Sequence, residues 1–391
     1  RESGAWKPTN WGTYSDQVTQ AGRALIALGF EPGQTACILG FNRPEWAILD
    51  LAAMGVGGAP AGIYTTCSPV EVRYIVAHSE APIILVENEA QWRKVEAERA
   101  NMPNLKHVVT MKGTPEIADE MVMSWEEFMA KGEEVARGIR SSTGNTDVEV
   151  EELELGSLAS IRSFAGRFLD RHDALQILVN NAGVMACPHE KTADGFELQF
   201  GTNHLGHFLL TCLIVPALLK GAPSRIVSLS SRAHQMSPVV FDDVNFEHRP
   251  YHKWLSYGQS KTANVLFAVE LERRLGSRDV HACAVHPGVI QTELSRYMGE
   301  EDWELIRSRA VAREGELRTK SVEAGAATSV YAATAPELEG RGGIYLEDCA
   351  ISEVDDSEDA SSGVRSYAVD PDAARRLWSL SEEMVGEVFD L

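Results

Sequence analysis

The sequence predicts an α/β protein made of two successive segments, each with a parallel sheet. Three observations favour this class. Helical and strand-like patterns alternate along most of the chain, short apolar runs are bounded by glycine and proline, and the alternation stops once, at about 113–145, in an acidic, methionine-containing stretch. We place the boundary near Lys131, which gives the segments 1–130 and 131–391.

The first segment is expected to hold four βα units. Apolar residues at Val18, Ala21, Leu25 and Leu28 recur at helical spacing, and Gly29 ends that helix where a Cβ would be strained. Strands are expected over 35–39, 59–64, 82–86 and 105–111. Helices are expected over 44–54, from Pro69 and around Trp92, and an amphipathic segment over 125–130.

The second segment resumes the alternation. Strands are expected over 175–179, 225–229, 280–285 and 343–346. Helices are expected over 157–171, 195–219, 257–275, 300–312 and 321–334, and from Pro371. The acidic run 353–359 has no apolar partners and is expected to be a solvated loop.

Composition narrows the function. The chain is 44% hydrophobic and 24% charged, which is ordinary for a globular protein, and its formal charge of −21 disfavours nucleic acid as a partner. Six cysteines without a CxxC pair favour reduced thiols and a cytoplasmic location. The apolar stretch 209–219 is about half of the ~20 residues that a bilayer span needs, so no integral membrane segment is expected.

Four patterns in the second segment suggest acid–base chemistry. Tyr257 and Lys261 are four residues apart, which places a phenol and an ammonium on one helical face, and a nearby cation favours the phenolate. Side chains that follow parallel strands meet in the ligand crevice at the carboxyl edge of the sheet. Such residues are Ser230 and Ser231, Asn180, Asn181 and Gly183, and the turn His286, Pro287 and Gly288 followed by Thr292; Asn203 lies within the helix predicted at 195–219.

These motifs resemble the short-chain dehydrogenase/reductase family, most closely its retinol-dehydrogenase-like members. The resemblance rests on ILVNNAG (177–183), TNHLGHF (202–208), RIVSLSSRAH (225–234), SYGQSKTANVLF (256–267) and HPGVIQTEL (286–294). It extends from about Arg137 to the C-terminus. It implies a Rossmann-like parallel sheet and hydride transfer between NAD or NADP and an alcohol/carbonyl pair, with no stated preference between the two cofactors.

The resemblance also implies roles for single residues. Tyr257 would be the general acid/base, and Lys261 would lower its pKa and hold the nicotinamide ribose. Ser231 would orient the substrate oxygen, with Ser230 as the weaker choice, and Asn203 would anchor a relay water. Asn181, Ala182 and Gly183 would lie beside the adenosine half of the cofactor, and Pro287, Gly288 and Thr292 beside the nicotinamide.

The substrate implied by the resemblance is a lipophilic alcohol or aldehyde. The segment 295–318 would cap its pocket, and a homo-oligomer is possible. The pairs His204/His207 and His248/His252 lack the context of a metal site, so no metal is expected.

One part of that family's pattern is missing. Its sheet begins with a strand and a TGxxxGxG turn that cradles the cofactor pyrophosphate, and this chain has no such motif. The glycines Gly55, Gly57, Gly58 and Gly62 follow a helix and not a strand, so they do not qualify. Glu154 stands where the family usually has Asp. We therefore expect a Rossmann-like sheet that lacks its usual first βαβ unit.

The N-terminal segment resembles a different family. The run from WGTYSDQVTQ to GGAPAGIYTTCSP (11–69) is similar to AMP-forming acyl-CoA synthetases, most like the long-chain bubblegum type, up to about 124–135. The phosphate loop that such ligases need lies downstream of the matching region and is absent. Fatty-acid–CoA ligase activity is therefore not expected.

Three interpretations of the whole chain stay open. The first is a fusion of two incomplete enzymes with little or no activity. The second is a working reductase whose first strands come from the N-terminal βαβ units or from another subunit. The third is a pseudoenzyme or binding module that keeps a nucleotide crevice without turnover.

Overall fold

The computed structural model describes residues 9–131, 133–314 and 317–391, which form two compact units, Arg1–Val150 and Glu151–Leu391. The division falls later than the predicted boundary at Lys131. The reason is a helix that the sequence pattern did not indicate, α6 (Glu134–Thr143), and the stretch that follows it. Arg23 of unit 1 holds this stretch, because its Nη2 donates to the Val150 carbonyl at 2.7 Å.

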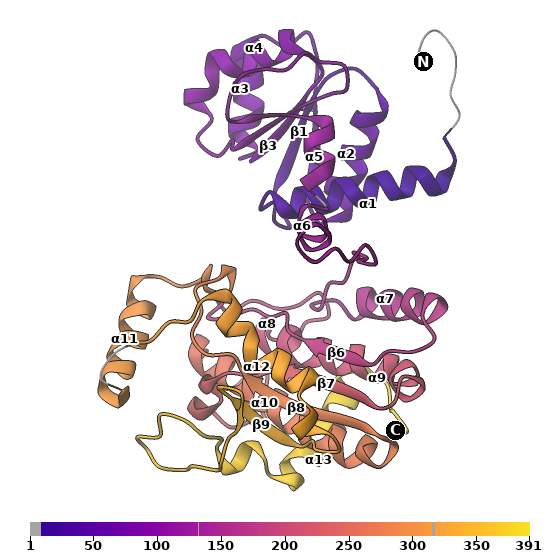
Figure 1. Cartoon of the computed structure of the whole chain (residues 1–391). Helices are drawn as coiled ribbons and strands as arrows, with labels where there is room; N and C mark the ends of the chain where they lie inside the picture. The colour runs from indigo at the N-terminus through magenta and orange to yellow at the C-terminus, as the bar shows by residue number, and fades with distance from the viewer. Residues whose placement is uncertain (1–8, 132, 315–316) are drawn as a thin grey trace. The chain divides into compact units, whose positions relative to one another are not determined.

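Unit 1 has a parallel sheet in the order β2-β1-β3-β4-β5, with helices on both faces (Figure 1). Its strands are β1 (Thr35–Leu39), β2 (Ala59–Ile63), β3 (Ile83–Val86), β4 (His107–Thr110) and the short β5 (Val122–Ser124). One face carries α1 (Trp11–Ala27), α2 (Pro44–Gly55) and α5 (Trp125–Lys131); the other carries α3 (Pro69–His78) and α4 (Glu89–Glu98). The four predicted strands are confirmed to within two residues at each end, and β5 was not predicted.

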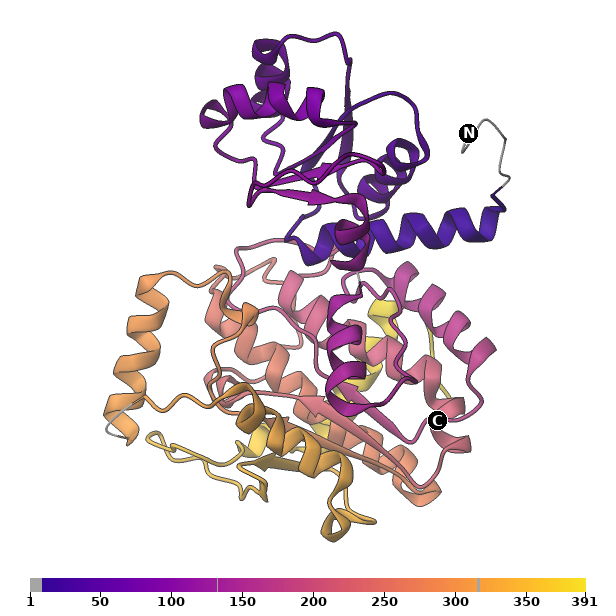
Figure 2. The same cartoon turned by 45° about the horizontal axis from the view of Figure 1, so that its top comes forward.

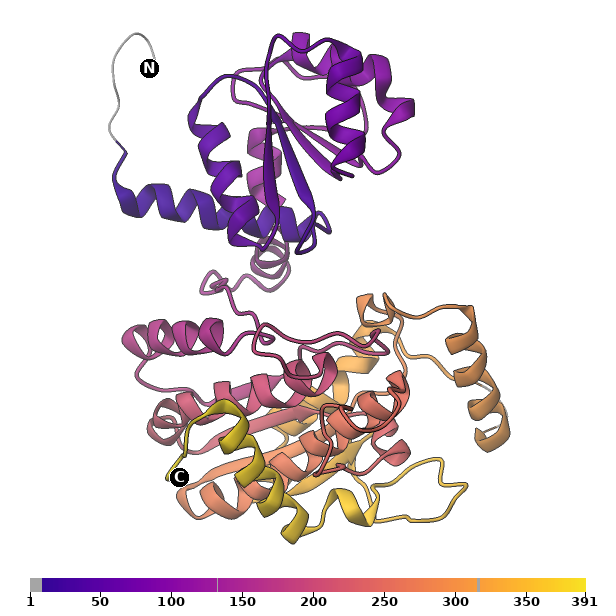
Figure 3. The same ribbon diagram turned by 180° about the vertical axis from the view of Figure 1, so that it is seen from behind.

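Unit 2 has a second sheet in the order β10-β9-β8-β7-β6, parallel except for β10. Its strands are β6 (Ile177–Asn180), β7 (Ser224–Leu229), β8 (Val280–His286), β9 (Ile344–Glu347) and β10 (Ala350–Ile351). The helices are α7 (Leu158–Arg171), α8 (Leu198–Phe200), α9 (Gly206–Lys220), α10 (Lys253–Leu275), α11 (Glu300–Glu314), α12 (Val322–Thr334) and α13 (Pro371–Val385). Figure 3 shows α9, α10 and α13 on one face of this sheet, and Figure 1 shows α12 on the other.

Strand β6 is the last strand at its edge of the sheet. Among the described residues no strand pairs with its outer side, and its side chains Ile177 and Val179 are 41% and 42% exposed. The predicted lack of the first βαβ unit agrees with this free edge. The strands of unit 1 form a sheet of their own.

The largest core of unit 2 lies between the sheet and helices α9, α10 and α13. Helix α9 is buried on nearly all sides, which explains its continuous apolar sequence. The stretch Leu198–Lys220 is long and apolar enough to cross a membrane, with a mean hydropathy of 1.4, but 83% of it is buried. Such burial is typical of a core helix.

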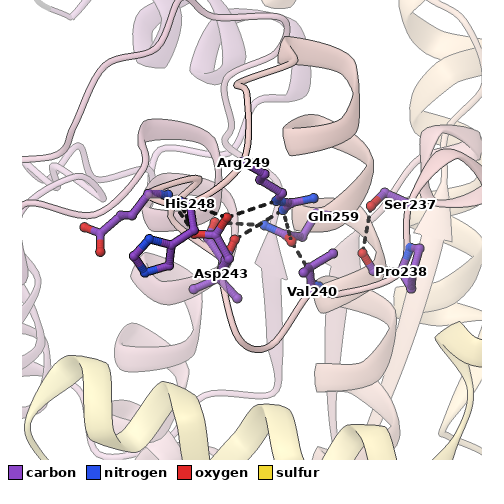
Figure 4. Close-up of polar contacts among 9 residues, drawn as sticks. Ser237, Pro238, Val240, Asp243, His248, Arg249 and Gln259 are labelled. Atoms are coloured by element: carbon purple, nitrogen blue, oxygen red, sulfur yellow. Dashed lines mark hydrogen bonds and ion pairs between the residues drawn. The ribbon is translucent and has the colours of Figure 1, made fainter.

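The segment between β7 and α10 is pinned to α10 by polar contacts (Figure 4). The Gln259 Oε1 accepts from the Val240 N–H at 3.0 Å and from Arg249 at 2.9 Å, and the Gln259 Nε2 donates to the Val244 carbonyl. Arg249 also lies 3.5 Å from the Asp243 carboxylate. These bonds satisfy the buried amide of Gln259 and fix the loop against the helix that carries Tyr257.

Gly221, directly after α9, gives a test of this packing. A Cβ there would lie 2.3 Å from the Leu175 carbonyl oxygen, which is backbone and cannot rotate away. We expect Gly221→Ala to destabilise unit 2 by about 1–3 kcal/mol, measured by urea unfolding followed by circular dichroism. The matched control is Gly166→Ala in α7, where nothing lies within 4 Å of the added methyl group. That variant should be neutral or slightly more stable, and an equal loss in both would contradict the packing argument.

Candidate active site

The predicted motif residues gather around one cavity at the carboxyl ends of β6, β7 and β8. The cavity has a volume of about 940 Å³. Nine of the ten predicted site residues line it: Asn181, Ala182, Gly183, Ser231, Tyr257, Lys261, Pro287, Gly288 and Thr292. The tenth, Asn203, lies behind Gly183. The topology alone explains this convergence, because the three strands are parallel neighbours.

Tyr257 lies in the second turn of α10. The helix begins at Lys253, earlier than the predicted start at 257, because the His252 side chain accepts the Leu255 N–H and caps it. Tyr257 is only 4% exposed, and its ring meets Trp254 edge to face. Burial raises the pKa of Tyr257, while a hydrogen bond with Ser231 lowers it. Burial outweighs the hydrogen bond, so the phenol is neutral at neutral pH.

Lys261 lies one turn after Tyr257, and its Nζ is 5.5 Å from the centre of the tyrosine ring. The same Nζ donates to the Leu229 carbonyl at 3.0 Å. Burial lowers the pKa of Lys261 to about 8. Burial and the Ser231 hydrogen bond are the causes of the shift in the Tyr257 pKa, so the lowering of that pKa by Lys261 stays a prediction.

The structure separates the two candidate serines. The Ser230 hydroxyl donates to the Lys261 carbonyl at 2.9 Å and is thus engaged with the backbone of α10. Both serines line the cavity, but Ser231 is the one that shares a hydrogen bond with Tyr257. Ser231 is therefore the serine placed beside the phenol.

Asn203 lies in a short π-helical turn, Gly201–Leu205, between α8 and α9. Such turns are rare and often occur at functional sites. Its side chain bonds to both backbone groups of Val184, with Oδ1 accepting at 2.8 Å and Nδ2 donating at 2.9 Å, and Nδ2 also donates to Ser260. The Asn203 carbonyl accepts from His207. Asn203 thus anchors the loop after β6, and its role toward a relay water stays a prediction.

The loops at the predicted cofactor residues pack closely, so two of their positions require glycine. Gly288 has φ +99°, which disfavours any residue with a side chain. A Cβ on Gly183 would lie 2.9 Å from the Asn203 Oδ1, so only glycine fits between the loop and its anchor. Among the described residues no strand–turn–helix beside β6 offers the usual phosphate cradle.

The sequence analysis did not identify His234, which makes a hydrogen bond with the backbone carbonyl of Ser231. Its Nδ1 lies 2.8 Å from the Ser231 carbonyl, and its Nε2 accepts the Arg365 N–H at 3.2 Å. These two partners require the neutral ring with the proton on Nδ1. The signal in the sequence is only a histidine three residues after a serine, which is too common to interpret.

The segment 295–318 was predicted to cap the substrate pocket, and several of its described residues line the cavity. It contains α11, which stands at one side of unit 2 in Figures 1 and 2. The apolar residues of this segment that line the cavity are Met298, Trp303, Leu305, Ile306 and Leu317. The cavity therefore joins a polar end at Ser231 and Tyr257 to an apolar wall.

Buried histidines make unit 2 sensitive to acid. Burial lowers the pKa of four of them, to about 3 or about 4: His204, His207, His234 and His286. The unfolded chain, with histidine pKa values near 6.5, takes up protons that the folded state refuses. Stability should therefore fall as the pH drops from about 6.5 toward 4.

The check is the urea midpoint of unfolding at pH 7 and pH 5. Glu197 and Glu347, whose pKa values are raised by burial, act in the opposite direction but are fewer. We expect a lower midpoint at pH 5 and a smaller difference in His234→Gln. An equal or higher midpoint at pH 5 would contradict the expectation.

The pair His204/His207, considered above as metal ligands, makes hydrogen bonds with other groups of the protein. The His204 Nε2 lies 2.8 Å from the Ser381 hydroxyl in the core, and the His207 Nδ1 lies 2.9 Å from the Asn203 carbonyl. Within the described part of the chain, no three His, Cys, Asp or Glu side chains gather as a metal site would require.

Comparisons with known proteins identify two sequence families. The family model described as short chain dehydrogenase matches residues 119–303, and that described as AMP-binding enzyme matches residues 3–160. Human "Retinol dehydrogenase 13" is 43% identical over 263 residues, which are 66% of this chain and 75% of that protein. "Short-chain dehydrogenase/reductase prx1" of Penicillium roqueforti is 42% identical over 243 residues, 61% of this chain and 70% of that protein.

Solved structures include a short chain dehydrogenase from Burkholderia cenocepacia in complex with NADP. It has a TM-score of 0.42 and 19% identity, and the match covers 65% of this chain and 91% of that one.

Proposed function

The chain belongs to the short-chain dehydrogenase family, and from this we propose that unit 2 is an NAD(P)-dependent oxidoreductase that interconverts a lipophilic alcohol and the corresponding carbonyl compound. The observation that carries the proposal is the grouping of Ser231, Tyr257 and Lys261 at one end of a cavity with an apolar wall. A hydroxyl, a buried phenol and an ammonium suit proton exchange at a substrate oxygen.

In carbonyl reduction the neutral phenol of Tyr257 donates its proton to the substrate oxygen. The Ser231 hydroxyl orients that oxygen. The Lys261 ammonium, with its Nζ 5.5 Å from the phenol ring, stabilises the phenolate that remains. Alcohol oxidation uses the same groups in reverse, so it should become faster as the pH rises and the phenolate forms.

A nicotinamide cofactor, when bound, supplies or accepts the hydride. The residues that would hold it are Gly183 with its neighbours Asn181 and Ala182, Lys261, and the Pro287, Gly288 and Thr292 turn. Lys261 would contact the ribose, and Gly288 lets the backbone approach the ring closely. The preference between NAD and NADP is left open by these residues.

The test is NADPH or NADH oxidation by the purified chain with long-chain aldehydes and retinaldehyde. We expect turnover that requires both cofactor and aldehyde. A folded protein without turnover over this substrate panel would contradict the proposed function.

The free outer edge of β6 favours a second candidate. Among the described residues, no strand followed by a phosphate-binding turn lies beside β6. The chain would then be a pseudoenzyme or binding module that retains the crevice without catalysis. Cofactor binding without turnover supports this candidate, and turnover excludes it.

Unit 1 is similar to AMP-binding enzymes, and we propose a structural role for it and not ligation. The proposal rests on the absence from the sequence of the Ser/Thr/Gly-rich loop that cradles ATP phosphates. ATP-dependent thioester formation from a fatty acid and CoA would contradict it. We also propose a cytoplasmic location, because all six cysteines are free thiols.

A further inference from the structure

One peptide unit beside the cavity is held at both of its polar groups by buried histidines. It joins Ser231 to Arg232, directly after the side chain that shares a hydrogen bond with Tyr257. Its carbonyl accepts from the His234 Nδ1 at 2.8 Å, and its N–H donates to the His286 Nδ1 at 3.3 Å. The two hydrogen bonds therefore fix the backbone that carries the Ser231 side chain.

His286 also reaches a second loop. It is the last residue of β8, is 5% exposed and lines the cavity. Its Nδ1 accepts the Gly288 N–H at 3.5 Å as well as the Arg232 N–H. A ring nitrogen has one lone pair, so the two donors share it, which accounts for distances at the long end of the hydrogen-bond range. One atom of His286 thus joins the loop after β7 to the turn after β8.

The partners of His286 determine where its proton lies. Because Nδ1 accepts two backbone hydrogen bonds it carries no proton, and the neutral ring has its proton on Nε2. Burial lowers the pKa of His286 to about 3, so the ring is neutral at pH 7. Among the described residues the buried Nε2 has no hydrogen-bond partner. Within that part of the chain, the ring therefore acts on its surroundings through Nδ1.

We infer that His286 is a positioning residue: through Nδ1 it holds Ser231, which orients the substrate oxygen, in register with the Gly288 turn, which would contact the nicotinamide cofactor. Reacting groups must approach to about 3–3.5 Å, and a misplacement of about 1 Å can cost about 100-fold in rate. The sequence motifs assign roles to Pro287 and Gly288 but none to His286. The inference rests on the proposed function and adds to it the link between its substrate loop and its cofactor loop.

Two polar substitutions separate the Nδ1 contacts from the size and polarity of the ring. In His286→Asn the amide oxygen takes the place of Nδ1 and can accept the same two N–H groups. In His286→Gln the longer side chain brings its amide to the place of Nε2, so the Nδ1 contacts are lost. Both variants keep a polar side chain, and circular dichroism checks that each is folded.

The first readout is kcat and KM of the full chain with dodecanal and saturating cofactor. We expect kcat to fall about 10- to 100-fold in His286→Gln and to stay within about threefold in His286→Asn. The KM for dodecanal should change by less than about threefold in both, because the apolar wall that would hold the aliphatic chain is unchanged. A role in stability alone would not produce this split between kcat and KM.

His281→Gln is the matched control. His281 lies near the opposite end of the same strand, and its Nδ1 is 3.0 Å from the Glu272 carboxylate. It does not line the cavity. This variant should keep kcat within about twofold of that of the unmodified protein.

The second readout does not require turnover. Hydrogen–deuterium exchange of the full chain, measured by mass spectrometry, reports the amides of Arg232 and Gly288 in two separate peptides. Both amides should exchange faster in His286→Gln, because they lose their common acceptor. In His286→Asn they should exchange as in the unmodified protein.

The inference would be overturned by full activity of His286→Gln, or by a kcat loss of the same size in His281→Gln. Unchanged exchange of the two amides in His286→Gln would also overturn it. A folded His286→Asn that loses kcat about tenfold or more overturns it alone, so the test stands even if His286→Gln does not fold. If the unmodified chain never turns over, the proposed function is contradicted, whereas faster exchange in His286→Gln still supports the link between the two loops.

Discussion

Tyr257→Phe should lower NAD(P)-dependent turnover by at least about 100-fold while the fold and the cofactor affinity are retained. Among the described residues that line the cavity, Tyr257 supplies the one phenol, it shares a hydrogen bond with Ser231, and general acid–base catalysis contributes at least that factor. Removing one hydroxyl from a side chain that is 4% exposed leaves the packing with Trp254 in place. The measurement is kcat with a reactive aldehyde under saturating cofactor.

The matched control is Tyr331→Phe. Tyr331 is in the same unit, on α12, and packs against the opposite face of the sheet. Tyr331→Phe also removes one phenolic oxygen, but outside the cavity. The turnover of this variant should therefore stay within about twofold of that of the unmodified protein. Retained activity in Tyr257→Phe, or an equal loss in both variants, would rule out the assigned role.

The second large effect is expected from Trp378→Ala on α13. Trp378 is 2% exposed, meets Phe208 edge to face with ring centres 4.9 Å apart, and carries the Arg274 guanidinium 4.0 Å above its ring. Truncating a buried tryptophan costs about 3–5 kcal/mol, which is a large part of the stability of a domain. Unit 2 should unfold at a much lower urea concentration.

Trp378→Phe separates packing from hydrogen bonding. The indole Nε1 is buried without a hydrogen-bond partner, so phenylalanine loses volume but no hydrogen bond. Its stability loss should be well below that of alanine. Because α13 packs on α10, the alanine variant should also lose activity as it unfolds, whereas the phenylalanine variant should keep it. Equal losses in the two variants would contradict a packing role.

The fold could be predicted where one pattern determines an element. Strand β1 over Thr35–Leu39 was predicted to the residue, because an apolar run lies between a proline–glycine turn and a second turn. The short strands β5 and β10 were missed, since two or three residues at a sheet edge carry no periodicity. Helix α6 was missed because it lies in the acidic stretch where we placed the boundary between the segments.

The site could be predicted because its residues follow parallel strands. Ser231 after β7 and Pro287 after β8 reach one cavity through topology alone. Features that depend on the three-dimensional packing could not be predicted. They are the burial that raises the Tyr257 pKa, the hydrogen bond of His234 to the Ser231 carbonyl, and the cations of the segment 295–318 that line the cavity. Those contacts join residues far apart in the chain, and no local pattern records them.

The central claim is that unit 2 holds a nicotinamide cofactor although the sequence has no TGxxxGxG turn. The most direct measurement is a fluorescence titration of the full chain with NADPH and with NADH, on protein shown to be folded by circular dichroism. The account predicts saturable binding of at least one of them at micromolar concentration, weakened in Lys261→Met. No saturable binding of either cofactor to the folded protein would contradict it and leave the chain as a fusion of two incomplete enzymes.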